Sequence, residues 1–200
     1  MIRRILAALL AVLFITGCTE IDVAGPVEEV PVDVDAKAID IAPEPPSEGV
    51  SPGRLVDGYL QALADPEGGY QVAREYLTPE ASAEWEPTTA VIYRGSIDGD
   101  DTGARVAGHR IGELDEIGRY TATHEEFTHD FDVVLHDGEY RIANPPDGLL
   151  LSPYLFSRYY RRVALYFMSL GGSNVVPDPI HVPESLVTPR VVVEGLLAGP

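Results

Sequence analysis

Cys18 is the only cysteine in a chain of 200 residues, and its thiol is a nucleophile that can accept a diacylglycerol group. It has no intramolecular disulfide partner, although an exported compartment would permit disulfides. The two residues just before it, Thr16 and Gly17, are small enough for a peptidase that cuts beside the cysteine. We therefore predict that Cys18 is lipidated and becomes the first residue of the mature chain.

The residues before Cys18 have the pattern of an export signal. Arg3 and Arg4 form a positive region, and an uncharged apolar run of eleven residues follows from Ile5 to Ile15. A membrane-spanning helix needs about 20 apolar residues, so this run fits a signal peptide better. The segment Ile15-Thr16-Gly17-Cys18 resembles the bacterial lipobox. It predicts acyl chains such as palmitate on the cysteine, which hold the protein at the extracytoplasmic face of the cell membrane. The alternative is an uncleaved anchor, or an ordinary signal peptide with an incidental cysteine.

His124 and Asp130 are the residues that best suit acid–base chemistry. On one extended strand their side chains share a face and could line a pocket. Six residues of strand separate them by about 20 Å, at about 3.3 Å per residue, so the two side chains could not touch directly. His109 could approach from a neighbouring strand. This set of residues gives the alternative of a small-ligand-binding or acid–base enzyme module.

Two other patterns superficially suggest a metal site. His124 and His129 are five residues apart, whereas the zinc helix motif needs four, and on a strand they point to opposite faces. Asp98, Asp100 and Asp101 resemble a calcium loop, but no glutamate stands at its twelfth position. We therefore predict polar surface residues and a tight acidic turn, with no metal and no cofactor.

The densest aromatic cluster lies in the last third of the chain. It consists of Tyr154, Phe156, Tyr159, Tyr160, Tyr166 and Phe167, with Arg158, Arg161 and Arg162 among them. One interpretation is a core that joins two modules. The other is a protein-binding patch, because aromatic residues and arginine are favoured interface anchors. The residues of that possible patch are Tyr154, Phe156, Arg158, Tyr159, Tyr160 and Arg161.

The strongly negative net charge argues against partners that are themselves negatively charged. The chain has 14 basic and 32 acidic residues, a formal net charge of −18, and removal of Arg3 and Arg4 with the signal brings it near −20. Such a chain repels phosphates and anionic lipid head groups. We therefore predict no nucleic-acid binding and no electrostatic docking on a membrane, so that the lipid alone provides the tether.

The order of the predicted elements determines where these residues lie. Nine acidic residues and five prolines, without an aromatic residue, predict a disordered stalk from Cys18 to Val50. After Ser51-Pro52, apolar residues follow at the spacing of one helix face: Leu55, Val56, Tyr59, Leu60 and Leu63. From Ala90 the period changes to two, with an acidic turn at Ile97–Gly103 and a long strand from Arg119 to Leu135. This α+β pattern resembles the NTF2-like fold, a cone-shaped sheet around a long first helix.

In the long strand, one face is predicted to pack on the helices, and the other is wet or lines a concavity. The first face carries Phe127, Phe131, Val133 and Leu135; the second carries Glu126, Thr128, Asp130 and Asp132. Beyond the sheet, two strands and a helix capped by Thr188-Pro189 cannot close a core by themselves. The predicted divisions are a signal peptide (1–17), an acidic stalk (18–50), an NTF2-like domain (51–148), a connector (149–161) and an incomplete second α+β module (162–200).

Several motifs resemble the start of the actinobacterial LpqB lipoprotein family. They are the lipobox, Ser51-Pro52-Gly53, Tyr76-Leu77-Thr78, Trp85-Glu86-Pro87, Val175-Val176-Pro177-Asp178-Pro179 and the stretch from Thr188 to Pro200. That last stretch, with Leu196-Leu197-Ala198-Gly199-Pro200 at its end, resembles the opening of a GerMN domain. Family members continue through that domain into a β-propeller, so the sequence is either the front of a longer protein or a truncated form.

The resemblance also implies a function. It implies a non-enzymatic envelope lipoprotein that is accessory to the MtrA–MtrB two-component system and to envelope maintenance. The expected partners are the membrane, through the lipid on Cys18, and the extracytoplasmic domain of a sensor kinase.

Overall fold

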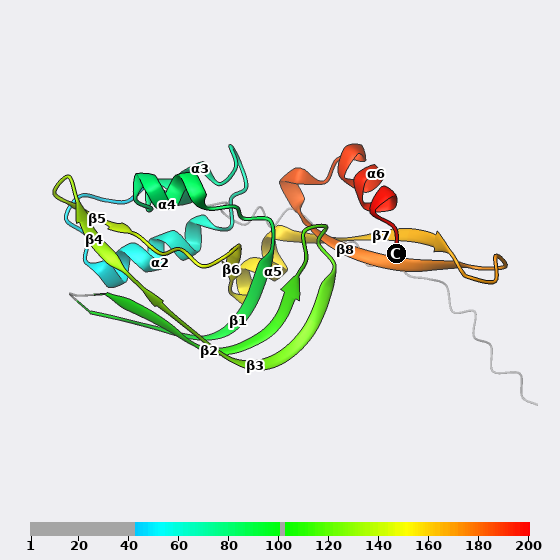
Figure 1. Ribbon diagram of the computed structural model, residues 1–200, viewed down its shortest axis with the longest axis horizontal. Helices are drawn as coiled ribbons and strands as arrows, with labels where there is room; N and C mark the ends of the chain where they lie inside the picture. Colours follow the sequence, from blue (N-terminus) through cyan, green and yellow to red (C-terminus); the bar gives the residue numbers. More distant parts are fainter. Residues whose placement is uncertain (1–42, 101–102) are drawn as a thin grey trace, which may run out of the picture. The chain divides into compact units, whose positions relative to one another are not determined.

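A computed structural model describes residues 43–100 and 103–200. Cys18, the predicted signal peptide and most of the predicted stalk lie outside these residues. The described residues all belong to one unit of helices and sheets, shown in Figure 1. The prediction of an α+β fold is confirmed.

Three helices begin the described part of the chain, and the apolar stripe of the longest one faces the core. They are α2 (Pro52–Ala62), α3 (Gln71–Glu75) and α4 (Pro79–Glu84). Proline starts α2 directly after Ser51, where its fixed φ suits the first helical position. The side chain of Thr78 caps α4 by accepting a hydrogen bond from the backbone of Ala81. The predicted stripe of α2 is buried: Leu55, Val56, Tyr59, Leu60 and Leu63.

The main sheet has four strands in the order β3-β2-β1-β6. They are β1 (Ala90–Gly99), β2 (Ala104–Leu114), β3 (Tyr120–Phe131) and β6 (Leu149–Leu151). The first three are antiparallel neighbours, and β6 pairs parallel with β1. The sheet is curved, and α2 lies across its concave side (Figure 1).

Two facing glycines permit the close approach of β1 and β2. Gly95 and Gly108 are paired in register, and β3 places Phe127 beside Gly108. A Cβ on Gly95 would lie 2.1 Å from the carbonyl oxygen of Ala107, and one on Gly108 would lie 2.3 Å from that of Arg94. No larger residue fits there without moving the backbone.

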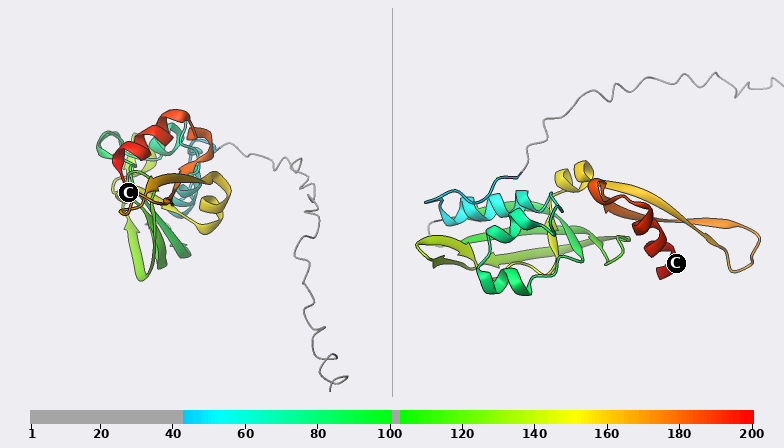
Figure 2. Two further views of the ribbon diagram at one scale, coloured as in Figure 1. Left: turned by 90° about the vertical axis from the view of Figure 1, so that its right-hand side faces the viewer. Right: turned by 90° about the horizontal axis from the view of Figure 1, so that it is seen from above.

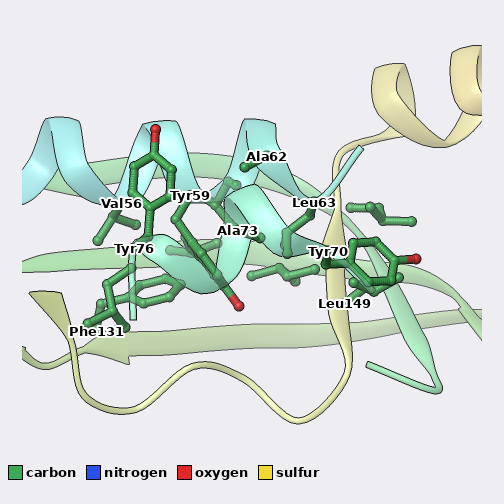
Figure 3. Packing of buried hydrophobic residues seen from close by; sticks show 14 of the residues in the cluster. Val56, Tyr59, Ala62, Leu63, Tyr70, Ala73, Tyr76, Phe131 and Leu149 are labelled. Atoms are coloured by element: carbon green, nitrogen blue, oxygen red, sulfur yellow. The ribbon is translucent and has the colours of Figure 1, made fainter. Parts of the chain in front are cut away.

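The main core is rich in aromatic residues (Figure 3). The ring of Tyr59 has its centroid 6.5 Å from that of Tyr76 and 6.1 Å from those of Phe131 and Trp85. The indole N–H of Trp85 donates to the carbonyl oxygens of Pro146 and Gly148, each at 3.2 Å. Trp85 therefore joins α4 to the segment that leads into β6.

The second part of the chain is a long hairpin with a helix packed on it. Its elements are α5 (Pro153–Tyr159), β7 (Tyr160–Met168), β8 (Val175–Pro183), the 3₁₀ turn η1 (Glu184–Leu186) and α6 (Pro189–Ala198). A small core forms from Leu165, Ile180 and Val182, with Val191 and Val192 of α6 against it. The side chain of Thr188 accepts a hydrogen bond from Val191, so the predicted cap of α6 is confirmed.

Two predicted elements differ from the structure in their bounds. Residues 149–161, predicted as a connector, include β6 and the helix α5. The predicted acidic turn at 97–103 overlaps β1, which continues to Gly99, and residues 101–102 lie outside the described residues. The predicted long strand is interrupted at Asp132, after which β4 (Val133–His136) pairs with β5 (Glu139–Ile142) as a separate hairpin. Phe131 is buried as predicted, but Leu135 is 67% exposed, because β4 has left the sheet that covers the core.

Candidate functional site

The turn between β2 and β3 contacts the hairpin directly. The backbone N–H of His181 on β8 donates to the carbonyl oxygen of Gly118 at 2.7 Å. Gly118 has φ +86°, and a Cβ there would lie 2.4 Å from the carbonyl oxygen of His181. The neighbouring Arg119 forms an isolated antiparallel bridge with Ile180. Glycine at 118 is therefore required both by the turn and by the approach of β8.

Arg119 is the polar centre of this contact. Its Nε donates to the carboxylate of Asp178 at 2.9 Å, and the two side chains are 27% and 30% exposed. A second guanidinium nitrogen donates to the carbonyl oxygen of Gly199, at the end of α6. One arginine thus connects the turn between β2 and β3 with both β8 and α6.

Aromatic rings pack beside this ion pair. Phe156 of α5 stacks on Tyr120 with ring centroids 5.9 Å apart, and it lies 5.4 Å from Tyr160 and 5.3 Å from His181. Burial lowers the pKa of His181, and the nearby charge of Arg162 lowers it further. We name this set the junction: Gly118, Arg119, Tyr120, Phe156, Tyr160, Asp178 and His181. Phe156 and Tyr160 therefore have the position expected of a core that joins two modules.

Replacing Arg119 with alanine is expected to loosen the junction while the part of the protein formed by α2–α4 and β1–β6 stays folded. The change removes a partly buried ion pair and a hydrogen bond to a carbonyl, together worth about 1–3 kcal/mol. We expect the amide of His181 to exchange its hydrogen about tenfold faster or more, as measured by hydrogen–deuterium exchange. The amide of Thr78, which donates to Ile142 within that part of the protein, should keep its rate.

Arg190→Ala is the matched control for Arg119→Ala, because the Arg190–Glu194 pair is an exposed i,i+4 pair on α6. Such a pair contributes little to stability. Unchanged protection of His181 in Arg119→Ala would contradict the assigned role of Arg119.

Of the remaining residues of the possible interaction patch, Tyr154 and Arg161 are exposed, and Arg158 and Tyr159 are half-buried. Tyr154 is 67% exposed, and the guanidinium of Arg158 lies over the ring of Tyr159 at 5.6 Å from its centroid. Arg161 forms an exposed ion pair with Glu184. We call these four residues the α5 patch: Tyr154, Arg158, Tyr159 and Arg161. Phe156, on the same helix, packs in the junction. The α5 patch therefore lies on a helix whose position is fixed by that packing.

His124 and Asp130 both lie on the exposed face of β3. His124 stacks on His109, with ring centroids 5.1 Å apart and planes at 9°. Asp130 pairs with Arg105, and this hydrogen bond holds the pKa of Asp130 below its usual value. The structure therefore brings His109 to His124, as the sequence suggested it could, but on a solvent-exposed surface.

Two hollows are formed by other residues. One of about 520 Å³ lies beside Trp85 and includes Glu84, Glu86 and Asp147 in its wall. One of about 360 Å³ lies between residues 46–50 and α2. Neither is lined by His124 or Asp130.

Within residues 43–100 and 103–200, no three histidine, cysteine, aspartate or glutamate side chains are grouped so that they could share a metal ion. In the same part of the chain, no helix has the length and apolar character needed to cross a membrane.

The described residues define an α+β domain joined through a packed junction to a hairpin-and-helix module. Residues 45–157 match the family model described as Lipoprotein LpqB, N-terminal domain. The chain therefore belongs to the LpqB lipoprotein family.

Curated relatives support this assignment. The Lipoprotein LpqB of Cutibacterium acnes is 34% identical over 98% of this chain and 34% of its own length. The Lipoprotein LpqB of Nocardia farcinica is 35% identical over 93% of this chain and 32% of its own length. The chain thus spans about a third of the length of the curated relatives it matches. No solved structure matches the chain. The name that these relatives share, Lipoprotein LpqB, supports a membrane-associated lipoprotein role for this chain.

Proposed function

We propose that this protein is a lipid-anchored, extracytoplasmic and non-enzymatic accessory of the MtrA–MtrB two-component system. In this proposal it contributes to envelope maintenance by binding the extracytoplasmic domain of the sensor kinase. Membership of the LpqB lipoprotein family supports the membrane location, and the lipobox-like segment before Cys18 supports the lipid anchor. The kinase as partner rests on the family resemblance.

The observation that carries the binding role is the α5 patch. Tyr154 is largely exposed although it is a large aromatic residue, and it lies on the same short helix as Arg158. Tyrosine and arginine are the residue types that most often dominate binding energy at protein interfaces. The junction holds Phe156, so the helix loses little conformational freedom when a partner binds.

The patch also differs in charge from the rest of the chain. No acidic residue occurs between Asp147 and Asp178, and three arginines lie in that interval. The formal net charge of the whole chain is −18. A partner with an acidic surface would therefore meet attraction at α5 and repulsion from most other parts of this protein.

The test measures binding of the purified lipoprotein to the extracytoplasmic domain of the sensor kinase. We expect the double variant Tyr154→Ala/Arg158→Ala to weaken binding at least about tenfold, because both anchors are removed. Arg190→Ala removes an arginine whose side chain is 85% exposed on α6, and it should bind as the unchanged protein does. Thermal unfolding of each variant shows whether the fold survives.

Equal affinity of the double variant and the unchanged protein would refute the role of the α5 patch. If the unchanged protein itself does not bind the kinase domain, the proposed partner is wrong.

A further inference from the structure

The distal half of the β7–β8 hairpin has an unusual composition for this chain. Residues 163–177 contain no charged residue, although charged residues make up 23% of the whole sequence. Figures 1 and 2 show the turn of the hairpin extending beyond the end of α6. The uncharged stretch therefore includes the end of the hairpin that α6 does not cover.

Large apolar side chains are exposed at this end. Leu170, in the turn, is fully exposed at 111%, and Met168 and Val175 are paired in register with exposures of 64% and 57%. Tyr166 and Val176 are 60% and 51% exposed. We name these five residues the hairpin tip: Tyr166, Met168, Leu170, Val175 and Val176. Nearer the junction the same hairpin is well covered, because Leu165 and Ile180 are each 1% exposed.

Positive charge borders the hairpin tip. In the register of β7 and β8, Arg162, Tyr166 and Met168 lie on one face of the hairpin, the face opposite Leu165. Arg162 is exposed. The nearest acidic residue along β8 is Asp178, whose carboxylate is paired with Arg119. One face therefore runs from an arginine through a tyrosine to apolar side chains at the turn.

We propose that the hairpin tip is a membrane-contact site that enters the interface of a bilayer containing anionic lipids. Apolar side chains gain free energy by leaving water for the acyl boundary. Tyrosine favours the level of the head groups, and arginine favours anionic lipid phosphates. The order of residues from tip to base matches this order of layers. The proposal does not depend on the sensor kinase as partner.

Net charge does not oppose this contact. The value of −18 suggests repulsion from anionic lipids, but it averages over an uneven distribution. Surface charges act over about one Debye length, roughly 8 Å at physiological ionic strength. The charges nearest the proposed contact are therefore decisive. In the hairpin register the first is Asp178, whose carboxylate is paired with Arg119, and the next is the exposed Arg162.

The lipid anchor leaves the hairpin enough chain to reach the membrane. Thirty-two residues separate Cys18 from Ser51, where α2 is about to begin. An extended chain of that length spans at most about 115 Å, at up to about 3.6 Å per residue. Anchor and hairpin would then be two contacts with one bilayer, and one would raise the local concentration of the other.

The experiment uses the full lipidated chain in vesicles, with a solvent-sensitive fluorophore on a single introduced cysteine. In the proposed function the sulfur of Cys18 carries the lipid, so the introduced thiol is the reactive one in the lipidated chain. Leu170→Cys places the label at the tip, and Leu135→Cys is the matched control, an exposed leucine on β4. Vesicles contain phosphatidylcholine alone or mixed with phosphatidylglycerol.

We expect the emission of the label at position 170 to shift to shorter wavelength on vesicles, and to shift more with phosphatidylglycerol present. The label at position 135 should not shift. Adding Arg162→Glu to Leu170→Cys should abolish the extra shift that the anionic lipid causes. An unshifted label at 170 on both kinds of vesicle would overturn the proposal. A label at 170 that is already shifted in detergent solution would also overturn it, because protein would then cover the tip.

Discussion

Replacing Trp85 with alanine should lower the free energy of unfolding by about 3–5 kcal/mol, which is typical of removing a large buried aromatic side chain. Trp85 is 5% exposed and lies against the rings of Tyr59 and Tyr70. Its removal leaves a cavity and takes a hydrogen-bond donor from two carbonyl oxygens, those of Pro146 and Gly148. The urea concentration at half unfolding is the measurement, and it should fall markedly.

Trp85→Phe separates the effect of the cavity from the effect of the lost hydrogen-bond donor. Phenylalanine keeps most of the apolar contact but has no N–H, so the loss should be well under that of alanine. A decrease below about 1 kcal/mol in Trp85→Ala would contradict the view that this side chain holds α4 against the segment before β6.

Replacing Gly108 with valine should lower the free energy of unfolding by about 3 kcal/mol or more, because the added side chain would overlap with backbone atoms. The new Cβ would lie 2.3 Å from the carbonyl oxygen of Arg94 and 2.5 Å from the Cα of Gly95. Neither atom can move without separating β1 from β2. We expect a lowered unfolding midpoint and faster amide exchange along both strands.

Ala107→Val is the control for Gly108→Val. It introduces the same residue one position earlier, where the side chain points to the other face of the sheet. A β-branched residue suits that position, so the change should stay within about 0.5 kcal/mol. If the two variants were equally stable, the close approach at Gly95 and Gly108 would not be the reason for glycine.

The sequence was informative where the signal is local. The spacing of apolar residues along α2 and the cap at Thr188 depend on neighbours within a few positions, and the structure confirms both. The three leucines of β6 were not recognised as a strand, because such a short apolar run becomes one only by pairing with β1. The break at Asp132 was also missed. Its backbone N–H donates to the side chain of Asn144, twelve residues away.

The junction could not be predicted for the same reason. Arg119 and Asp178 are 59 positions apart, and nothing near either residue indicates the other. The aromatic cluster was visible in the sequence, but the sequence did not show which of its residues are buried and which are exposed. Phe156 and Tyr160 pack inward while Tyr154 stays exposed, and only the placement of α5 against Tyr120 determines this.

For the acid–base alternative, the spacing of residues predicted the shared strand face correctly but could not predict its exposure to solvent. His124 and Asp130 share a face of β3, as the period of two predicted. Period alone does not say which face of a sheet the helices cover. In the structure that face is exposed, with Asp130 paired to Arg105.

We propose above all that the body of this protein is tethered to the membrane by a lipid on Cys18. The most direct test is the mass of the native protein extracted from membranes, together with the mass of its amino-terminal peptide. We expect the peptide to begin at Cys18 and to carry a diacylglycerol with or without a further acyl chain. An amino-terminal peptide with an unmodified Cys18 would contradict this proposal.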